Sequence, residues 1–559
     1  MTNNIQSKKN SEETVNETTT PDLSDRLGDA HMNLLPKKKL LITMFAMSFN
    51  LFTAFCDQNS ITVALSEISK DLNSEKTINW AATAALLANT VCQVLFGRLA
   101  DIFGRKFILL LSISVLGIAD LCCGFAQTGT QFYVFRAFAG IGFGGIQGST
   151  MVLVSDIVTL KQRGKYQGIL GSNVGMGNAI GPFLMSAFIK HSSWRNFYHM
   201  MPCLLAFQFA LTWYFVDNRQ NELNSVLTRL DKFKNIDYLG MFFGTASLTL
   251  LLIPLNGGGS TYAWNSVLVI VMFVVGGVSM VAFLIIESKI PKLPMIPLRL
   301  FTTTSLNLIF SSNFLYGIVY YSFQFFIPYY FQIVKGWDEL HSSILLLPLV
   351  ITQAAASTVA GTIISKVGHY KYVIIVGYGA WFVACCLLLL FKENTHRGVI
   401  CVVLFIFGCG VGWTFQPTIV AAQAQSKKAD RAVVISTRNV VRSLGGALGT
   451  AIASLIVSNG LLREITKAMD NPDDYNDIPV SYLNYLKAHI YTKVKITGVS
   501  DDQVKTVRHM YMIAIRDYFY LTIPLMGLCF ISAFFVKDRG LQCIDEVPDN
   551  EKVSDKEKV

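Results

Sequence analysis

Charged residues are scarce in this chain. Asp, Glu, Lys and Arg make up 15% of its 559 residues, whereas hydrophobic residues make up 52%. A soluble domain carries about 25% charged residues, so this composition excludes an ordinary soluble protein. The hydrophobic residues gather in runs of about 20, the length of a transmembrane helix. These runs do not alternate in polarity as barrel strands do. The sequence therefore predicts an all-α polytopic membrane protein.

The chain also lacks the residue clusters that are typical of enzymes and metal sites. Its eight histidines are scattered, and its 11 cysteines follow no disulfide or metal-ligand spacing. No phosphate-binding loop is present, because Lys106 is followed by Phe107 rather than by Ser or Thr. We therefore expect a protein that is not an enzyme, with no metal and no cofactor, and with the proton gradient as its energy source.

The excess of positive charge lies in short loops. The net charge is +10, and most Lys and Arg residues lie in every second loop between apolar runs. The turn near 127–131 and the loop near 257–264 have neither residue. The positive-inside rule places the basic loops, and with them both termini, in the cytoplasm. No basic domain remains outside the membrane, so we expect no nucleic-acid partner.

Fourteen apolar runs are long enough to be transmembrane helices. Their expected ranges are 40–65, 79–98, 107–127, 131–157, 167–189, 199–216, 237–256, 265–287, 305–332, 342–365, 371–391, 398–424, 433–458 and 512–536. Arg163 precedes Gly181 by the same 18 residues that separate Arg431 from Gly449, which indicates two related halves.

The expected organisation is two six-helix halves with two extra central helices. The predicted parts are a disordered cytoplasmic tail at 1–39, an N-terminal half at 40–216, a linker with the two extra helices at 217–304, a C-terminal half at 305–536 with a long extracytoplasmic loop at 459–511, and a cytoplasmic tail at 537–559.

A basic turn at 97–106 joins the second and third runs, with the sequence Gly-Arg-Leu-Ala-Asp-Ile-Phe-Gly-Arg-Lys. It resembles the signature loop of the major facilitator superfamily. The resemblance implies the major facilitator fold and a latch that holds the outward-facing state. A turn that only sets the topology is the alternative. The residues that match the loop are Gly97, Asp101, Gly104, Arg105 and Lys106.

Asp57 lies in the first predicted helix, where a carboxylate is costly unless it meets water or a partner. The segment Phe55–Leu65 resembles the first-helix motif of fungal-type fourteen-span drug–proton antiporters, although Asn59 and Ser66 replace the usual Thr and Pro. The resemblance implies that Asp57 binds the coupling proton. The alternative is a paired Asp near the outer interface that takes no part in coupling. Arg136 is similar to a superfamily arginine implicated in proton transfer. Its alternative is a side chain that reaches the outer interface.

Two further segments resemble superfamily motifs. Asp156 with Arg163 and Gly164 is similar to the second cytoplasmic loop signature, which implies a gating ion pair and is also found in vacuolar transporters of basic amino acids. Gly177, Gly181 and Pro182 resemble the antiporter motif, which is more frequent in exporters than in importers. Close helix packing alone would also explain these glycines.

The candidate substrate residues lie in the ninth and thirteenth predicted helices. An aromatic wall suits lipophilic or cationic compounds, although an interfacial belt would look similar. Two arginines, Arg438 and Arg442, share a helical face and either line the cavity or reach the interface. The candidates for the cavity are Tyr320, Tyr321, Gln324, Arg438 and Asn439.

Together these features predict a proton-coupled secondary transporter that exports small lipophilic or cationic compounds, such as drugs and toxins, from the cytosol by alternating access. We expect a monomer in the lipid bilayer, in the plasma membrane rather than the vacuolar membrane. The main alternative is a vacuolar proton antiporter for basic amino acids. A non-transporting nutrient sensor of the same fold is a more distant one.

Overall fold

The computed structural model describes most of the predicted membrane region. The described residues are 35–74, 77–217, 234, 237–258, 262–289, 295–296, 298–427, 430–476, 478–488, 500–538 and 540–541. The expected disordered tail therefore lies outside the described residues up to residue 34, as do residues 542–559 of the C-terminal tail.

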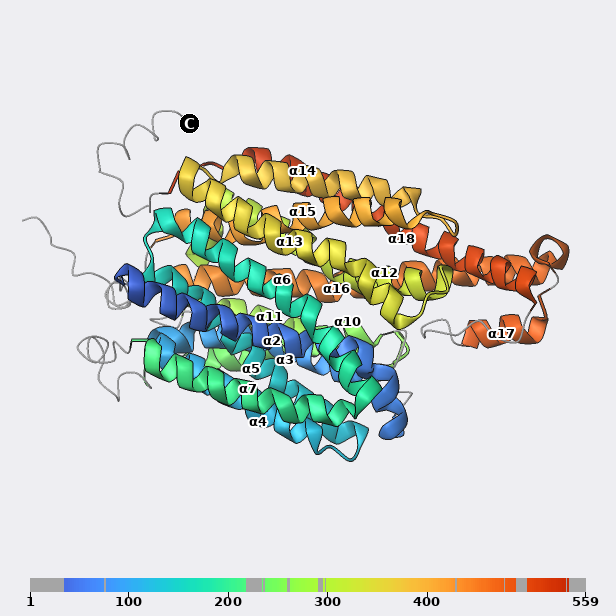
Figure 1. The fold of residues 1–559 in the computed structure, drawn as a ribbon, viewed down its shortest axis with the longest axis horizontal. Helices are drawn as coiled ribbons and strands as arrows, with labels where there is room; N and C mark the ends of the chain where they lie inside the picture. The colour runs from blue at the N-terminus through green and yellow to red at the C-terminus, as the bar shows by residue number, and fades with distance from the viewer. Residues whose placement is uncertain are drawn as a thin grey trace, which may run out of the picture.

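Fourteen α-helices of 17 residues or more occur among the described residues, and each overlaps one predicted span (Figure 1). They are α2 (Lys37–Asp71), α3 (Asn79–Phe103), α4 (Arg105–Gly124), α5 (Gly129–Ile157), α6 (Leu160–His191), α7 (Trp194–Phe215), α10 (Tyr238–Gly257), α11 (Val267–Lys289), α12 (Thr304–Tyr329), α13 (Glu339–Val367), α14 (Lys371–Leu387), α15 (Arg397–Ala424), α16 (Arg431–Asp470) and α18 (Asp501–Phe535).

Ten of these helices are long and apolar enough to cross a membrane, and the bent helix α3 raises the number to 11. Helices α6, α7 and α12 are long enough, but their glycine, tyrosine and polar residues lower the mean hydropathy. These residues are suited to packing inside a bundle rather than to contact with lipid. Fourteen membrane spans therefore remain a prediction.

The helices form two groups with α10 and α11 between them (Figure 1). Helices α2–α7 pack on one another, as do α12–α16 with α18. Helix α10 packs on α11, on α3 of the first group and on α16 of the second. Helix α11 exposes a row of valines, which are Val267, Val271, Val274, Val275, Val278 and Val281. This surface is suited to lipid.

The segment 459–511, which the sequence predicts to be a long extracytoplasmic loop, is partly helical. Helix α16 continues to Asp470 and α18 begins at Asp501. The two extensions pack together, with Arg463 Nη2 2.8 Å from Asp517 Oδ2. A prediction from hydropathy alone places the end of a membrane helix where charged residues begin. Here the extension of α16 instead buries an apolar stripe at helical spacing that consists of Leu461, Ile465 and Ala468.

The start of α18 is defined by a capping box. The Ser500 hydroxyl accepts a hydrogen bond from the Gln503 N–H at 3.4 Å, and the Gln503 side chain accepts one from the Ser500 N–H at 3.1 Å. Asp501 and Asp502 in the first turn add negative charge at the positive end of the helix. These local signals start the helix well before its apolar portion.

A single residue separates α3 from α4. Gly104 has a φ of 101°, a backbone angle that residues with a side chain rarely adopt. It lets the chain reverse between Phe103 and Arg105. Helix α2 begins and α18 ends at this same end of the bundle (Figure 1). The charge pattern predicts that this end is cytoplasmic.

Candidate functional site

A buried ion pair joins α2 to α5. Arg136 Nη1 donates hydrogen bonds to both oxygens of Asp57, at 2.9 and 3.0 Å, and both side chains are 0% exposed. Arg136 therefore does not reach the outer interface, which was the alternative from sequence. The Arg136 guanidinium also lies 5.8 Å from the centre of the Tyr198 ring on α7.

A second carboxylate, Asp120 on α4, lies beside this pair. One of its oxygens is 3.8 Å from Arg136 Nη1, and its side chain is also 0% exposed. Neither Asp120 oxygen has a hydrogen-bond partner in the part of the chain that the structure describes. Sequence reasoning missed Asp120, although the signal that pointed to Asp57, a lone carboxylate in an apolar run, was present there as well. We call Asp57, Asp120 and Arg136 the charge triad.

A second ion network lies at the predicted cytoplasmic end. Arg105 on α4 lies 2.5 Å from an Asp101 oxygen on α3 and 3.0 Å from an Asp156 oxygen on α5. Arg98 is 3.5 Å from Asp101. The structure thus brings the two cytoplasmic loop motifs together, with Arg105 as the bridge.

Other residues of the two loop motifs make contacts with neighbouring segments. Lys106 Nζ donates to the Trp213 carbonyl oxygen at 2.6 Å. Gly97 packs against Ser436 of α16, on the other half of the molecule. Arg163 donates to the Ser155 carbonyl oxygen at 2.7 and 3.0 Å.

Helix α6 packs closely against α13 of the second half near this same end. Gly164 lies against the backbone of Gly361, and the Lys165 N–H donates to Ser365 Oγ at 2.8 Å. Further along α6, Ser172 donates to the Ala354 carbonyl oxygen at 2.6 Å. These contacts close the two halves against each other at the predicted cytoplasmic end.

The antiporter motif lies on the outer part of α6, where the helix turns to a different neighbour. Gly177 and Gly181 pack against the backbone of α2 at Phe52 and Cys56. Pro182 lies within the same continuous helix. The motif therefore packs against α2 next to Asp57. The neighbours described for these two glycines all belong to α2, not to the second half.

Two arginines lie in the interior of the second half. Arg438 Nη2 donates to the Phe415 carbonyl oxygen at 2.7 Å and to Thr418 Oγ1 at 2.9 Å. Arg442 Nη1 donates to the Tyr321 hydroxyl at 2.6 Å. Both side chains are buried, so neither reaches the interface. Among the described residues, no ion pair includes either arginine.

Of the other predicted cavity residues, Asn439 and Tyr321 contact this arginine pair. Asn439 accepts a hydrogen bond from Arg438 at 3.0 Å. Tyr320 lies 3.5 Å from Gln353 of α13 through its hydroxyl, and Gln324 is half-buried one turn further along α12. The rings of Tyr321 and Phe415 lie 5.4 and 5.2 Å from the Arg442 guanidinium.

The arginine pair also has unused hydrogen-bond donors. The buried donor atoms without a partner include Arg438 Nε, Arg442 Nε, Asn439 Nδ2 and Gln416 Nε2. A carboxylate is an acceptor only and matches such a surplus of donors.

Comparison with known proteins identifies the family. Residues 47–450 match the Major Facilitator Superfamily. The chain belongs to this superfamily. This confirms the family and the fold predicted from the turn at 97–106, and the chain is an integral multi-pass transporter.

Individual relatives within the superfamily differ in their described roles. The chain is 41% identical to citrate exporter 1 of Yarrowia lipolytica over 94% of this chain and 76% of that protein. It is 28% identical to the vacuolar membrane amino acid uptake transporter fnx2 of Schizosaccharomyces pombe over 89% and 84%. The solved proton:xylose symporter XylE has the same fold, with a TM-score of 0.58, 12% identity and coverage of 92% and 99%.

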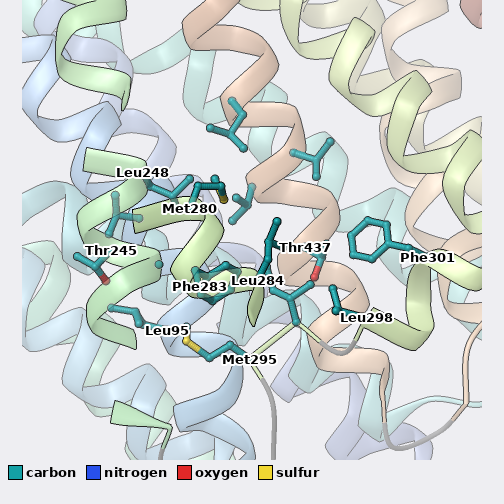
Figure 2. Close-up of a pocket in the computed structure, with 16 residues that line it drawn as sticks. Leu95, Thr245, Leu248, Met280, Phe283, Leu284, Met295, Leu298, Phe301 and Thr437 are labelled. Atoms are coloured by element: carbon teal, nitrogen blue, oxygen red, sulfur yellow. The ribbon is translucent and has the colours of Figure 1, made fainter. Parts of the chain in front are cut away.

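This superfamily member also has an apolar cavity of about 160 Å³ between α3, α10, α11 and α16 (Figure 2). Leu248, Met280 and Phe283 line it, and among its described lining residues only Thr245 and Thr437 carry a side-chain hydroxyl. The cavity lies on another side of α16 from the arginine pair, and none of its described lining residues is charged.

Proposed function

We propose that this transporter exports a small anion that carries carboxylate groups, coupled to protons, by alternating access. The observation that carries this proposal is the buried pair Arg438 and Arg442, which no described carboxylate balances. An arginine at the centre of a membrane helix costs about 3 kcal/mol on insertion scales, and such residues mark substrate pathways. Two unbalanced arginines on one helix face call for an anion.

The aromatic residues around the pair support an anion over the cation that sequence favoured. The faces of Tyr321 and Phe415 are already turned to the arginines, with Phe415 4.9 Å from the Arg438 guanidinium. A substrate cation would have to compete with these side chains for the same rings. Arginine binds carboxylates through two parallel hydrogen bonds, which favours a substrate with several such groups.

Two further observations support export and coupling. A relative that shares 41% of its aligned residues is described as a citrate exporter. The charge triad supplies a buried carboxylate that can load a proton, since Asp57 and Asp120 are both within reach of Arg136. The two hydrogen bonds Lys165–Ser365 and Ser172–Ala354 join the halves on the part of α6 nearer the predicted cytoplasmic end, which supports an outward-facing arrangement.

The test uses purified protein in proteoliposomes with an imposed pH gradient and radiolabelled citrate as the probe. The wild type should accumulate citrate, and Arg442→Gln should lower the rate about tenfold or more, because a hydrogen bond to a charged group contributes about 1.5–3 kcal/mol. Arg463→Gln is the matched control on the same helix, since that side chain is 54% exposed. Equal rates for Arg442→Gln and the wild type would contradict the proposal.

The vacuolar alternative is tested in the same vesicles. Basic amino acids would need a carboxylate partner, and the described carboxylates of the charge triad already face Arg136. Excess lysine should therefore leave citrate transport unchanged, and so should the lipophilic cation tetraphenylphosphonium. Microscopy of a tagged copy distinguishes the plasma membrane from the vacuolar membrane.

A further inference from the structure

The charge triad is not balanced as a set. It contains two carboxylates and one guanidinium, and all three side chains are 0% exposed. With both carboxylates ionised, the set would carry a net negative charge in a dry interior. A buried charge without a partner costs several kcal/mol, whereas a neutral acid avoids that cost.

We propose that Asp120, rather than Asp57, holds the exchangeable proton of this transporter. The proposal rests on the proton coupling proposed above and names the group that carries it. Its basis is the asymmetry of the triad: Arg136 Nη1 donates to both oxygens of Asp57 at 2.9 and 3.0 Å, whereas its ion-pair contact with Asp120 is longer, at 3.8 Å.

The two carboxylates therefore have different roles. Asp57 has two charge-assisted hydrogen bonds, which stabilise its ionised form. Asp120 has no hydrogen-bond partner at either oxygen among the described residues, so no such bond stabilises its ionised form there. Protonation of Asp120 leaves the Asp57–Arg136 pair intact and makes the whole triad neutral.

Among the described residues, the groups that interact with the triad include no second cation. Those that interact with it electrostatically are Cys56 on α2, Cys123 on α4 and Tyr198 on α7. Free thiols and phenols are uncharged near pH 7. One proton is therefore the simplest way to neutralise the triad. In the proton step, a proton from water adds to an Asp120 carboxylate oxygen and later returns to water on the other side.

Infrared spectroscopy of the purified full-length protein in lipid tests this assignment. The carbonyl stretch of a protonated carboxyl differs from that of a carboxylate. The wild type at neutral pH should show a band of a buried protonated carboxyl that shifts when the protein is labelled with ¹³C-aspartate, and Asp120→Asn should lose this label-sensitive band. The control Asp71→Asn removes a partly exposed carboxylate of α2 that pairs with Arg195, and it should keep the band.

A second variant guards against misfolding of the first. Asp120→Glu keeps the carboxyl group, so its band should persist but no longer shift when the protein is labelled with ¹³C-aspartate. A label-sensitive band that persists in Asp120→Asn, a wild type without this band, or a band in Asp120→Glu that still shifts with the label would each overturn the proposal.

The pH dependence of transport gives a functional readout. Citrate exchange without a gradient should vary with pH in the wild type and become flat in Asp120→Asn, while uptake driven by a pH gradient is lost. The infrared measurement needs no substrate. A wild type that shows the band but moves no citrate would therefore defeat the proposed substrate class and leave the Asp120 assignment standing.

Discussion

The two halves of the molecule handle buried charge in opposite ways. In the first half, Arg136 is hydrogen-bonded to Asp57 and lies near Asp120, so the cation has more carboxylates than it needs. In the second half, Arg438 and Arg442 have carbonyl and hydroxyl oxygens as acceptors but no carboxylate among the described residues. A surplus of carboxylates is suited to binding a proton, whereas a surplus of guanidinium groups is suited to binding an anionic substrate.

The largest effect expected from this comparison is on stability. Arg136→Gln removes the single cation of the triad and leaves Asp57 buried without its partner, at a cost of about 3–5 kcal/mol. The melting temperature of the detergent-solubilised protein should fall sharply. The double variant Arg136→Gln with Asp57→Asn should recover much of the loss, because it removes both members of the pair.

The contrasting variant is Arg442→Gln in the second half. It removes a cation that no carboxylate balances, so the melting temperature should stay the same or rise, even though citrate transport falls. An equal loss of stability in Arg136→Gln and Arg442→Gln would show that the two halves do not differ in the way described.

An intermediate effect is expected where the halves meet. A methyl group on Gly361 would overlap the Gly164 carbonyl oxygen, so Gly361→Ala should separate α6 from α13 and favour opening at the predicted cytoplasmic end. A cysteine introduced at Ser365 should then react faster with a water-soluble maleimide. Gly277→Ala is the control, because an added methyl group there meets no atom within 4 Å. Unchanged labelling would argue against a closing role for this contact.

The smallest effect is expected at the ion pair outside the bundle. Arg463 and Asp517 are 54% and 32% exposed, and such pairs contribute about 1 kcal/mol or less. Arg463→Ala should therefore shift the melting temperature only slightly, and high salt should remove even that difference. A shift as large as that of Arg136→Gln would mean that burial is not what separates the strong pairs from the weak ones.

Much of the fold was predictable because membrane helices can be recognised in a sequence by their length and their apolar composition. The segment 459–511 was the exception, since its charged residues hide an apolar stripe that is buried only when α16 meets α18. Motifs identified Asp57 and Arg136, but Asp120 belongs to none and was passed over. The sequence could not show whether the Arg438 side chain is buried. The spacing of Arg438 and Arg442 is the same whether their side chains lie inside the bundle or extend to the membrane interface.

The long extensions of α16 and α18 have a mechanical consequence. At 1.5 Å per residue, the 40 residues of α16 span about 60 Å, roughly twice the hydrocarbon thickness of a bilayer. The outer ends of both helices extend beyond the rest of the bundle (Figure 1). If the second half rocks as a rigid body by about 10°, the tip of a 60 Å rod moves about 10 Å. A spectroscopic label near Asp470 would thus magnify a small tilt inside the membrane into a distance that is easy to measure.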